Sequence, residues 1–233
     1  MRNQCKVIFY KFRRFLLFYL AIAFMAGMGF FSGFVKFPQV FPNANVYDAF
    51  VFSVCDTSLV FMLALTTSWF LGSDFGNRTI HHELTLGYSR WSVMLVRELP
   101  VMLSGVILHL TFVFATMLGL ACKTGFPIHL FGTQDIFWCL TVMLQVMALE
   151  SILVLITFLC AKASSAIAVS ACFTIITCNV LRNFLDGPIF TRSVFCFAPD
   201  NSWDTLIPAS IVSIVTLAAA IAATYLVFRK KDI

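Results

Sequence analysis

Charged residues are scarce in this chain. Asp, Glu, Lys and Arg make up 12% of its 233 residues, whereas a soluble domain carries about 25%. Hydrophobic residues make up 60%, and the mean hydropathy is +0.92. The apolar runs are continuous and close to the ~20 residues that a helix needs to cross a bilayer, unlike the short alternating segments of a membrane barrel. This scarcity of charge excludes an ordinary soluble domain and indicates a helical membrane protein.

Motifs for catalysis and for metal binding are also missing. The chain has no GxxxxGK run before Ser or Thr, no HExxH and no GxSxG. Its eight cysteines are scattered without a CxxC pair, so zinc spacing is absent, although Cys122 and Cys196 are both expected near the outer face and could pair. His81, His82 and Glu83 are adjacent, but neighbouring helical side chains point about 100° apart and suit a metal poorly. We therefore expect no catalytic residue, metal or cofactor in this chain.

Six apolar runs organise the sequence. We predict a single transmembrane domain over residues 1–233, an all-α membrane protein with six transmembrane helices. The predicted spans are residues 15–35, 49–71, 99–121, 136–160, 164–184 and 206–228. The basic, partly apolar segment 1–14 is expected to form an amphipathic helix against the membrane lipid.

The distribution of basic residues predicts the orientation. Twelve of the 16 Lys and Arg residues fall in the two termini, in segment 72–98 and in the turn after span four. Because positive charge favours the cytoplasmic side, both termini and segment 72–98 are predicted to be cytoplasmic. This topology explains the net charge of +5 and gives no reason to expect a nucleic-acid partner.

Segment 72–98 is a polar island between two apolar runs. Ser73 or Asp74 is expected to cap a short helix running to about Leu84. Gly87 suits a chain reversal, and Ser89 is expected to cap the helix that enters span three. The result is a short cytoplasmic helix with several apolar side chains, which is typical of a docking element rather than of a free loop.

Ionisable residues inside the predicted spans are the other candidates. Asp56 lies where Arg182 of span five can reach it, which predicts a structural ion pair. His109 and Glu150 lie ~15 Å deep and could pair, could line a path for a cationic group, or could be satisfied by hydroxyls such as those of Thr111 and Ser151. Segment 186–205 mixes Pro, Asp and aromatic residues, so we expect an outer re-entrant or interfacial segment.

Several strings of the island carry a family resemblance. Residues 74–80 (DFGNRTI), followed by Leu84-Thr85 and by residues 87–90 (GYSR), resemble the cytoplasmic loop of ABC exporter permeases of the type-2 family. The six spans, the cytoplasmic termini and the basic lead-in fit that family too. One position departs from its pattern, because the usual Gly-Thr pair reads Arg78-Thr79. The form of the loop is closest to small bacterial permeases for peptide antibiotics and bacteriocins.

The resemblance implies a division of labour between subunits. This chain would be the non-enzymatic permease, paired with a second copy or a paralogue in a bacterial plasma membrane. Separate ATPase subunits would bind ATP and Mg²⁺, and the cargo would be a hydrophobic or amphipathic compound such as a peptide antibiotic, a bacteriocin or a drug. The short helix would be the coupling helix. The implied docking residues are Phe75, Thr79, Ile80 and Leu84, with Ser89 and Arg90 anchoring the turn.

Three other functions stay open at this point. A substrate-binding membrane component of a vitamin-uptake transporter would have about six spans, but it would bind its ligand in a polar outer pocket. An intramembrane enzyme would use Glu150 and His109. An anchor or immunity protein would bind its partner without transport. For Arg90, contact with lipid phosphate is an alternative to anchoring the turn.

Overall fold

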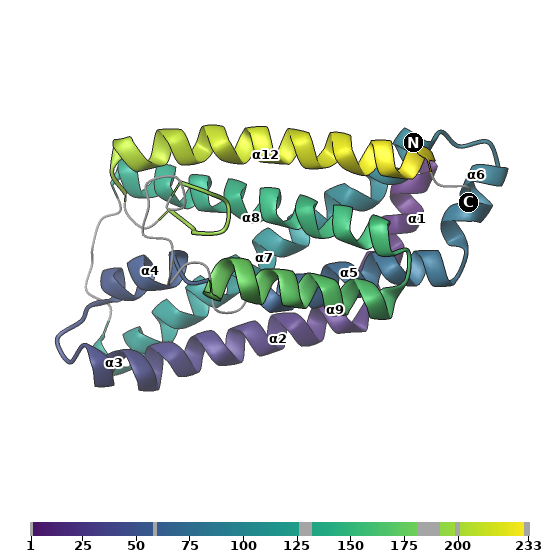
Figure 1. Cartoon of the computed structure of the whole chain (residues 1–233). Helices are drawn as coiled ribbons and strands as arrows, with labels where there is room; N and C mark the ends of the chain where they lie inside the picture. The colour runs from purple at the N-terminus through teal and green to yellow at the C-terminus, as the bar shows by residue number, and fades with distance from the viewer. Residues whose placement is uncertain (1, 58–59, 126–131, 181–191, 199–200, 231–233) are drawn as a thin grey trace.

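The computed structural model describes residues 2–57, 60–125, 132–180, 192–198 and 201–230. Every regular element in those residues is a helix, so the all-α prediction is confirmed (Figure 1). The helices are α1 (Arg2–Arg13), α2 (Leu16–Phe31), the π-helix η1 (Ser32–Lys36), α3 (Phe37–Val40), α4 (Val46–Val54), α5 (Val60–Gly76), α6 (Thr79–Thr85), α7 (Arg90–Thr124), α8 (Thr133–Cys160), α9 (Ala163–Thr174), the π-helix η2 (Ile175–Val180) and α12 (Trp203–Lys230).

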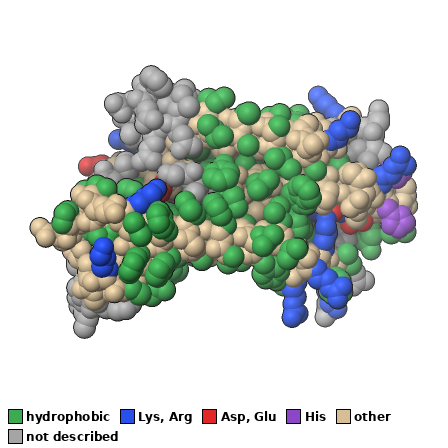
Figure 2. All heavy atoms as spheres, turned by 90° about the horizontal axis from the view of Figure 1, so that it is seen from below, with side chains coloured by type: hydrophobic (Ala, Val, Ile, Leu, Met, Phe, Trp, Pro, Cys, Tyr) green, Lys and Arg blue, Asp and Glu red, His purple; other side chains and the backbone are tan. Residues whose placement is uncertain are grey.

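Within the described residues, four helical stretches are long and apolar enough to cross a membrane. They are Leu16–Val40, Arg90–Thr124, Thr133–Cys160 and Trp203–Lys230. On the face that Figure 2 shows, apolar side chains cover the middle of the molecule, and Lys and Arg side chains gather mainly at one end. A multi-pass membrane protein is the class that these features support. The other two predicted spans take a different form.

The second predicted span is not one continuous helix. α4 ends at Val54 and α5 begins at Val60, so the prediction of an unbroken helix over residues 49–71 is wrong. Asp56 and Thr57 lie in the break, and such side chains compete with the helical hydrogen bonds of the backbone. Side chains in the break donate hydrogen bonds to other parts of the bundle. Thr57 Oγ1 donates to the Cys178 carbonyl at 3.2 Å, and Cys55 Sγ donates to the Ala198 carbonyl at 3.0 Å.

The fifth predicted span is also irregular. α9 gives way at Ile175 to the π-helix η2, which runs to Val180. Arg182 lies outside the described residues, as does the ion pair predicted between it and Asp56.

Close helix packing holds the bundle together. α2 packs along α7, α12 along α8, and α5 along α9. Gly29 of α2 meets α7 so closely that a Cβ there would lie 2.6 Å from the Phe112 carbonyl oxygen. Small residues allow such approaches between membrane helices, where van der Waals packing drives association.

Helix α1 and the C-terminal end of α12 lie at the same end of the molecule as α6 (Figure 1). We call this the α6 end. Its apolar core is one cluster of buried residues contributed by helices α1, α5, α6, α7, α8 and α12. The members of this α6-end cluster are Ile8, Phe70, Leu71, Ile80, Val93, Met94, Val96, Val101, Val154, Phe158 and Phe228.

The turns around α6 agree only in part with prediction. The expected cap at Ser73 or Asp74 is wrong, because α5 continues to Gly76 and α6 starts after Arg78, whose φ is 54°. The reversal at Gly87 is confirmed by its φ of 85°. The cap at Ser89 is also confirmed, since its side chain accepts a hydrogen bond from the Ser92 N–H at 3.2 Å.

A segment between α9 and α12 folds into the opposite end of the bundle. Ala198 donates its N–H to Gln145 Oε1 at 2.9 Å and accepts from Trp138 Nε1 at 2.8 Å. Gln145 lies about 18 Å along α8 from its first residue, so residues 193–198 are held within the bundle. Cys196 is buried there and Cys122 is exposed, and both thiols are free, so the two cysteines do not form a disulfide.

Candidate docking site at the α6 end

A buried arginine fixes α6 to the bundle. Arg97 of α7 is fully buried. Its Nε donates to Asp74 Oδ2 at 2.8 Å, and its Nη2 and Nη1 donate to the two carboxylate oxygens of Glu83 at 2.8 and 2.9 Å. A two-pronged guanidinium–carboxylate contact fixes orientation as well as distance. One side chain therefore ties α5, α6 and α7 together.

Lys11 extends this network to α1. Its ammonium group forms an ion pair with Asp74 and donates to Ser73 Oγ at 3.3 Å. Asp74 is only 1% exposed, so it needs such compensation, because an unpaired carboxylate in an apolar interior is strongly unfavourable. We call Lys11, Asp74, Glu83 and Arg97 the charge network.

The sequence alone did not identify the charge network. Arg97 counted only as one of the basic residues that set the topology. A signal was available, since two acids and an arginine fall between two apolar runs. Their pairing, however, depends on how α6 folds back.

The inner face of α6 belongs to the core. Ile80 is 1% exposed and lies in the α6-end cluster, and Leu84 packs against that cluster. The Phe75 ring meets the Phe158 ring edge-on at 5.2 Å. Thr79 is half-buried. Of the expected docking residues, Ile80 thus has no surface to offer a partner, and Phe75 and Leu84 offer little.

The outer face of α6 and the turn after it are exposed. His81, His82 and Thr85 face solvent, Leu86 is 63% exposed, and Tyr88 is also exposed. We call these five residues the α6 outer face. A single exposed leucine is unremarkable, but Leu86 and Tyr88 follow each other closely on a face that none of the described residues covers.

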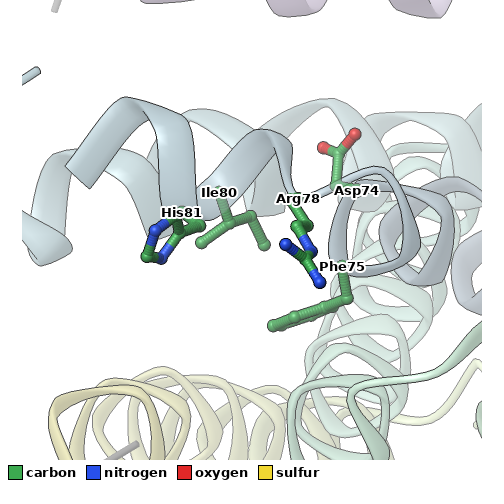
Figure 3. Close-up of a pocket in the computed structure, with 5 residues that line it drawn as sticks. All are labelled: Asp74, Phe75, Arg78, Ile80 and His81. Atoms are coloured by element: carbon green, nitrogen blue, oxygen red, sulfur yellow. The ribbon is translucent and has the colours of Figure 1, made fainter. Parts of the chain in front are cut away.

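A pocket of about 200 Å³ adjoins this face at the corner between α5 and α6. Its lining residues are Asp74, Phe75, Arg78, Ile80 and His81 (Figure 3). Arg78 is exposed and sits at the turn itself. The corner therefore combines a cationic side chain with an apolar hollow.

The exposed charge at the α6 end is basic. Among the described residues there, Lys6, Arg13, Arg14, Arg78, Lys162, Arg229 and Lys230 are exposed. The acids at this end that the structure describes are internal: Asp74 and Glu83 belong to the charge network, and Glu98 is 1% exposed. This surface therefore favours an acidic protein surface or anionic lipid.

Arg90 has a specific internal role. Its Nη1 donates to the carbonyls of Phe228 and Arg229 at 2.7 and 2.8 Å, at the end of α12. The last carbonyls of a helix lack partners within it and carry partial negative charge, so a cation is favoured there. Arg90 thus joins the start of α7 to the end of α12.

His109 and Glu150 do not pair with each other. His109 Nε2 lies 3.2 Å from the Val54 carbonyl at the end of α4, and its ring meets Phe197 at 5.2 Å. Glu150 accepts a hydrogen bond from Thr67. Of the alternatives that the sequence left open, a His109–Glu150 pair is therefore not formed.

Glu150 is satisfied by a nearby hydroxyl, as one alternative expected, although the donor is Thr67 rather than Ser151. Thr111 and Ser151 donate to carbonyls of their own helices. His109 instead contacts the Val54 carbonyl, which the break in the second span leaves without a helical partner.

Asp56 and His109 share one small cavity. Its other lining residues are Met25, Val60, Leu63 and Phe112. The cavity therefore lies where α2 and α7 meet the break between α4 and α5.

No His, Cys, Asp and Glu side chains gather into a metal-binding group of three or more within the described ranges. Comparison of the chain with protein-family models, with curated proteins and with solved structures found no match. The functional argument therefore depends on the sequence pattern and on the geometry of the α6 end.

Proposed function

We propose that this chain is the permease subunit of an ATP-driven export system. It works with separate ATPase subunits, which hold ATP and Mg²⁺, and with a second copy or a paralogue of itself. The proposal supposes six spans in a bacterial plasma membrane. α4 and α5 form the second span, α9 and η2 belong to the fifth, and both termini are cytoplasmic. The cargo is hydrophobic or amphipathic.

The attachment of α6 carries this proposal. A helix that transmits force from a soluble partner must move as one body with the helices behind it. Arg97 and Lys11 link α6, α5, α7 and α1 by ion pairs that are buried at Arg97 and partly buried at Lys11. A solvated loop needs no such attachment, and exposed ion pairs stabilise little.

The burial pattern of α6 supports a choice of which side would meet the ATPase. Ile80 and Leu84 hold the helix to the bundle, so the α6 outer face, with Arg78 at its corner, is the docking surface. Its basic surroundings suit an acidic rim on the ATPase. The residues implied by the family resemblance thus position the helix, and their neighbours make the contact.

The test is co-purification followed by ATP hydrolysis in lipid vesicles. We expect the chain, purified from its native membrane, to bring with it a polypeptide that hydrolyses MgATP. Leu86→Asp should reduce the amount retained at least tenfold, because it places a carboxylate in the contact. Asn43→Asp introduces the same charge at the opposite end and should change nothing.

Two results would refute the assignment. One is full retention of the ATPase by the Leu86→Asp protein in folded form. The other is a parent chain that brings no ATP-hydrolysing partner from a membrane in which it is active.

A further inference from the structure

Two carboxyl groups are buried in the bundle with unpartnered oxygens. Glu98 is 1% exposed, and neither of its carboxyl oxygens has a hydrogen-bond partner. Glu150 is fully buried, and its Oε1 has no partner, although Thr67 donates to its Oε2. Buried polar atoms are almost always satisfied, and ionisable groups inside membrane segments commonly mark a functional path.

Glu150 of α8 lies against α7, and helix geometry places Glu98 on the same face of α7. A Cβ at Gly105 of α7 would lie 2.6 Å from Glu150 Oε1, so this glycine faces that carboxyl group. At 100° per residue, Glu98 and Gly105 point within about 20° of each other, with about 10 Å between them along the helix. Met94 and Val101, which flank Glu98, share the α6-end cluster with Val154, one turn along α8 from Glu150.

A third polar side chain, His109, lies on the same face of α7. This residue is one turn beyond Gly105, about 6 Å along the helix. It shares a cavity with Asp56, at the break between α4 and α5. Irregular backbone at membrane depth is tolerated where it is buried in protein or lines a cavity, and broken helices mark the binding sites of many transporters.

We propose that this face of α7 is one wall of the translocation path and that it recognises a cationic group on an amphipathic substrate. Glu98 and Glu150 act as successive counter-ions for an ammonium or guanidinium group that moves between the α6 end and the opposite end. This inference rests on the proposed transport function and names its substrate class.

The sign of the charge follows from the surroundings. Neither Glu98 nor Glu150 has a Lys or Arg ion pair in the described part of the chain, where the ion pairs all belong to the charge network. An ionised carboxylate alone in this interior costs several kcal/mol, and an arriving cation offsets that cost. Apolar neighbours such as Met25, Met102 and Phe112 suit the hydrophobic body of the substrate.

The structure shows this path closed. Glu150 fills the space beside Gly105, so a substrate enters only when α7 and α8 separate. Glu98 and Glu150 are then exposed to the cargo in turn. Each carboxylate binds the cation only while α7 and α8 are separated beside it.

Equilibrium binding of tetraphenylphosphonium, a lipophilic cation, to the purified chain without any ATPase tests the inference. Glu98→Gln and Glu150→Gln should each weaken binding at least tenfold, whereas Glu150→Asp, which keeps the charge, should stay within about threefold. Thr141→Val is the control, because Thr141 is a buried hydroxyl on α8 that bonds to Phe137 and Ser210; its affinity should equal that of the parent.

Equal affinity in the two glutamine variants would overturn the inference. So would a folded parent chain that binds no tetraphenylphosphonium, or one that only takes up and releases protons. Since this assay contains no ATPase, its failure is distinguishable from failure of the docking assignment, which is measured by retention of the partner.

Discussion

Replacing Arg97 by methionine removes the centre of the charge network and keeps a side chain of similar length. Glu83 loses contacts of 2.8 and 2.9 Å, and Asp74 loses one of 2.8 Å while keeping Lys11. Removing one partner of a buried ion pair typically costs 3–5 kcal/mol. Because Lys11 still compensates Asp74, and Glu83 can turn toward water, we expect the lower end, about 3 kcal/mol. That corresponds to roughly a 100-fold increase in the opening of α6.

Hydrogen exchange in lipid nanodiscs measures this opening directly. In the parent chain, the amides of α6 should be protected through Ile80 and the charge network. In Arg97→Met they should exchange about 100-fold faster, while the middle of α8 keeps its protection.

Neutralising the other partners should restore much of this protection. A variant that combines Arg97→Met with Asp74→Asn and Glu83→Gln leaves no uncompensated carboxylate at Glu83. Arg13→Met removes an exposed cation and should leave exchange unchanged. The reasoning fails if α6 in Arg97→Met exchanges within threefold of the parent rate, or if Arg13→Met has the same effect.

Three further predictions concern other parts of the molecule. Arg90→Ala should destabilise the end of α12 by about 1–3 kcal/mol, because two carbonyls lose a charged donor; proteolysis of the C-terminal tail measures this, and an unchanged cleavage rate contradicts it. Gly29→Ala should lower the unfolding temperature through overpacking worth about 1–3 kcal/mol, whereas Gly27→Ala, with nothing within 4 Å of its added Cβ, should be neutral or stabilising. Tyr47 donates a hydrogen bond to Asp135 Oδ1 at 2.7 Å, so Tyr47→Phe should destabilise the contact between α4 and α8 by about 1.5–3 kcal/mol. Thermal unfolding in lipid nanodiscs measures this loss, and an unchanged unfolding temperature would contradict it.

Patterns that repeat along the chain were predictable from the sequence. Apolar runs gave the helical membrane class, because the bilayer sets the length of a helix. Local chemistry was also readable: Ser89 caps α7 through its own side chain, and Gly87 adopts the positive φ that its lack of a Cβ permits. These features depend on residues a few positions apart.

Features that depend on distant contacts were missed. The break near Asp56 persists because Thr57, Cys55 and Val54 find partners on other elements. Hydropathy alone reads this stretch as one span. Ile80 was expected to face a partner, but Arg97 holds Glu83, one turn along α6, against the bundle and so turns that face inward. The short helix between the apolar runs was predictable from the sequence. Which of its sides is exposed depends on how the chain folds.

Photo-cross-linking from position 86 tests the docking claim most directly. A photoreactive residue replacing Leu86, which is 63% exposed at the α6 end, should cross-link to the ATP-hydrolysing subunit in native membranes. The same residue replacing Leu118, which is 50% exposed on the span, should not. We predict that the position-86 adduct contains a protein that binds MgATP and that its yield changes when ATP is added. Adducts to lipid alone at position 86, in membranes where the ATPase is present and active, would contradict the account.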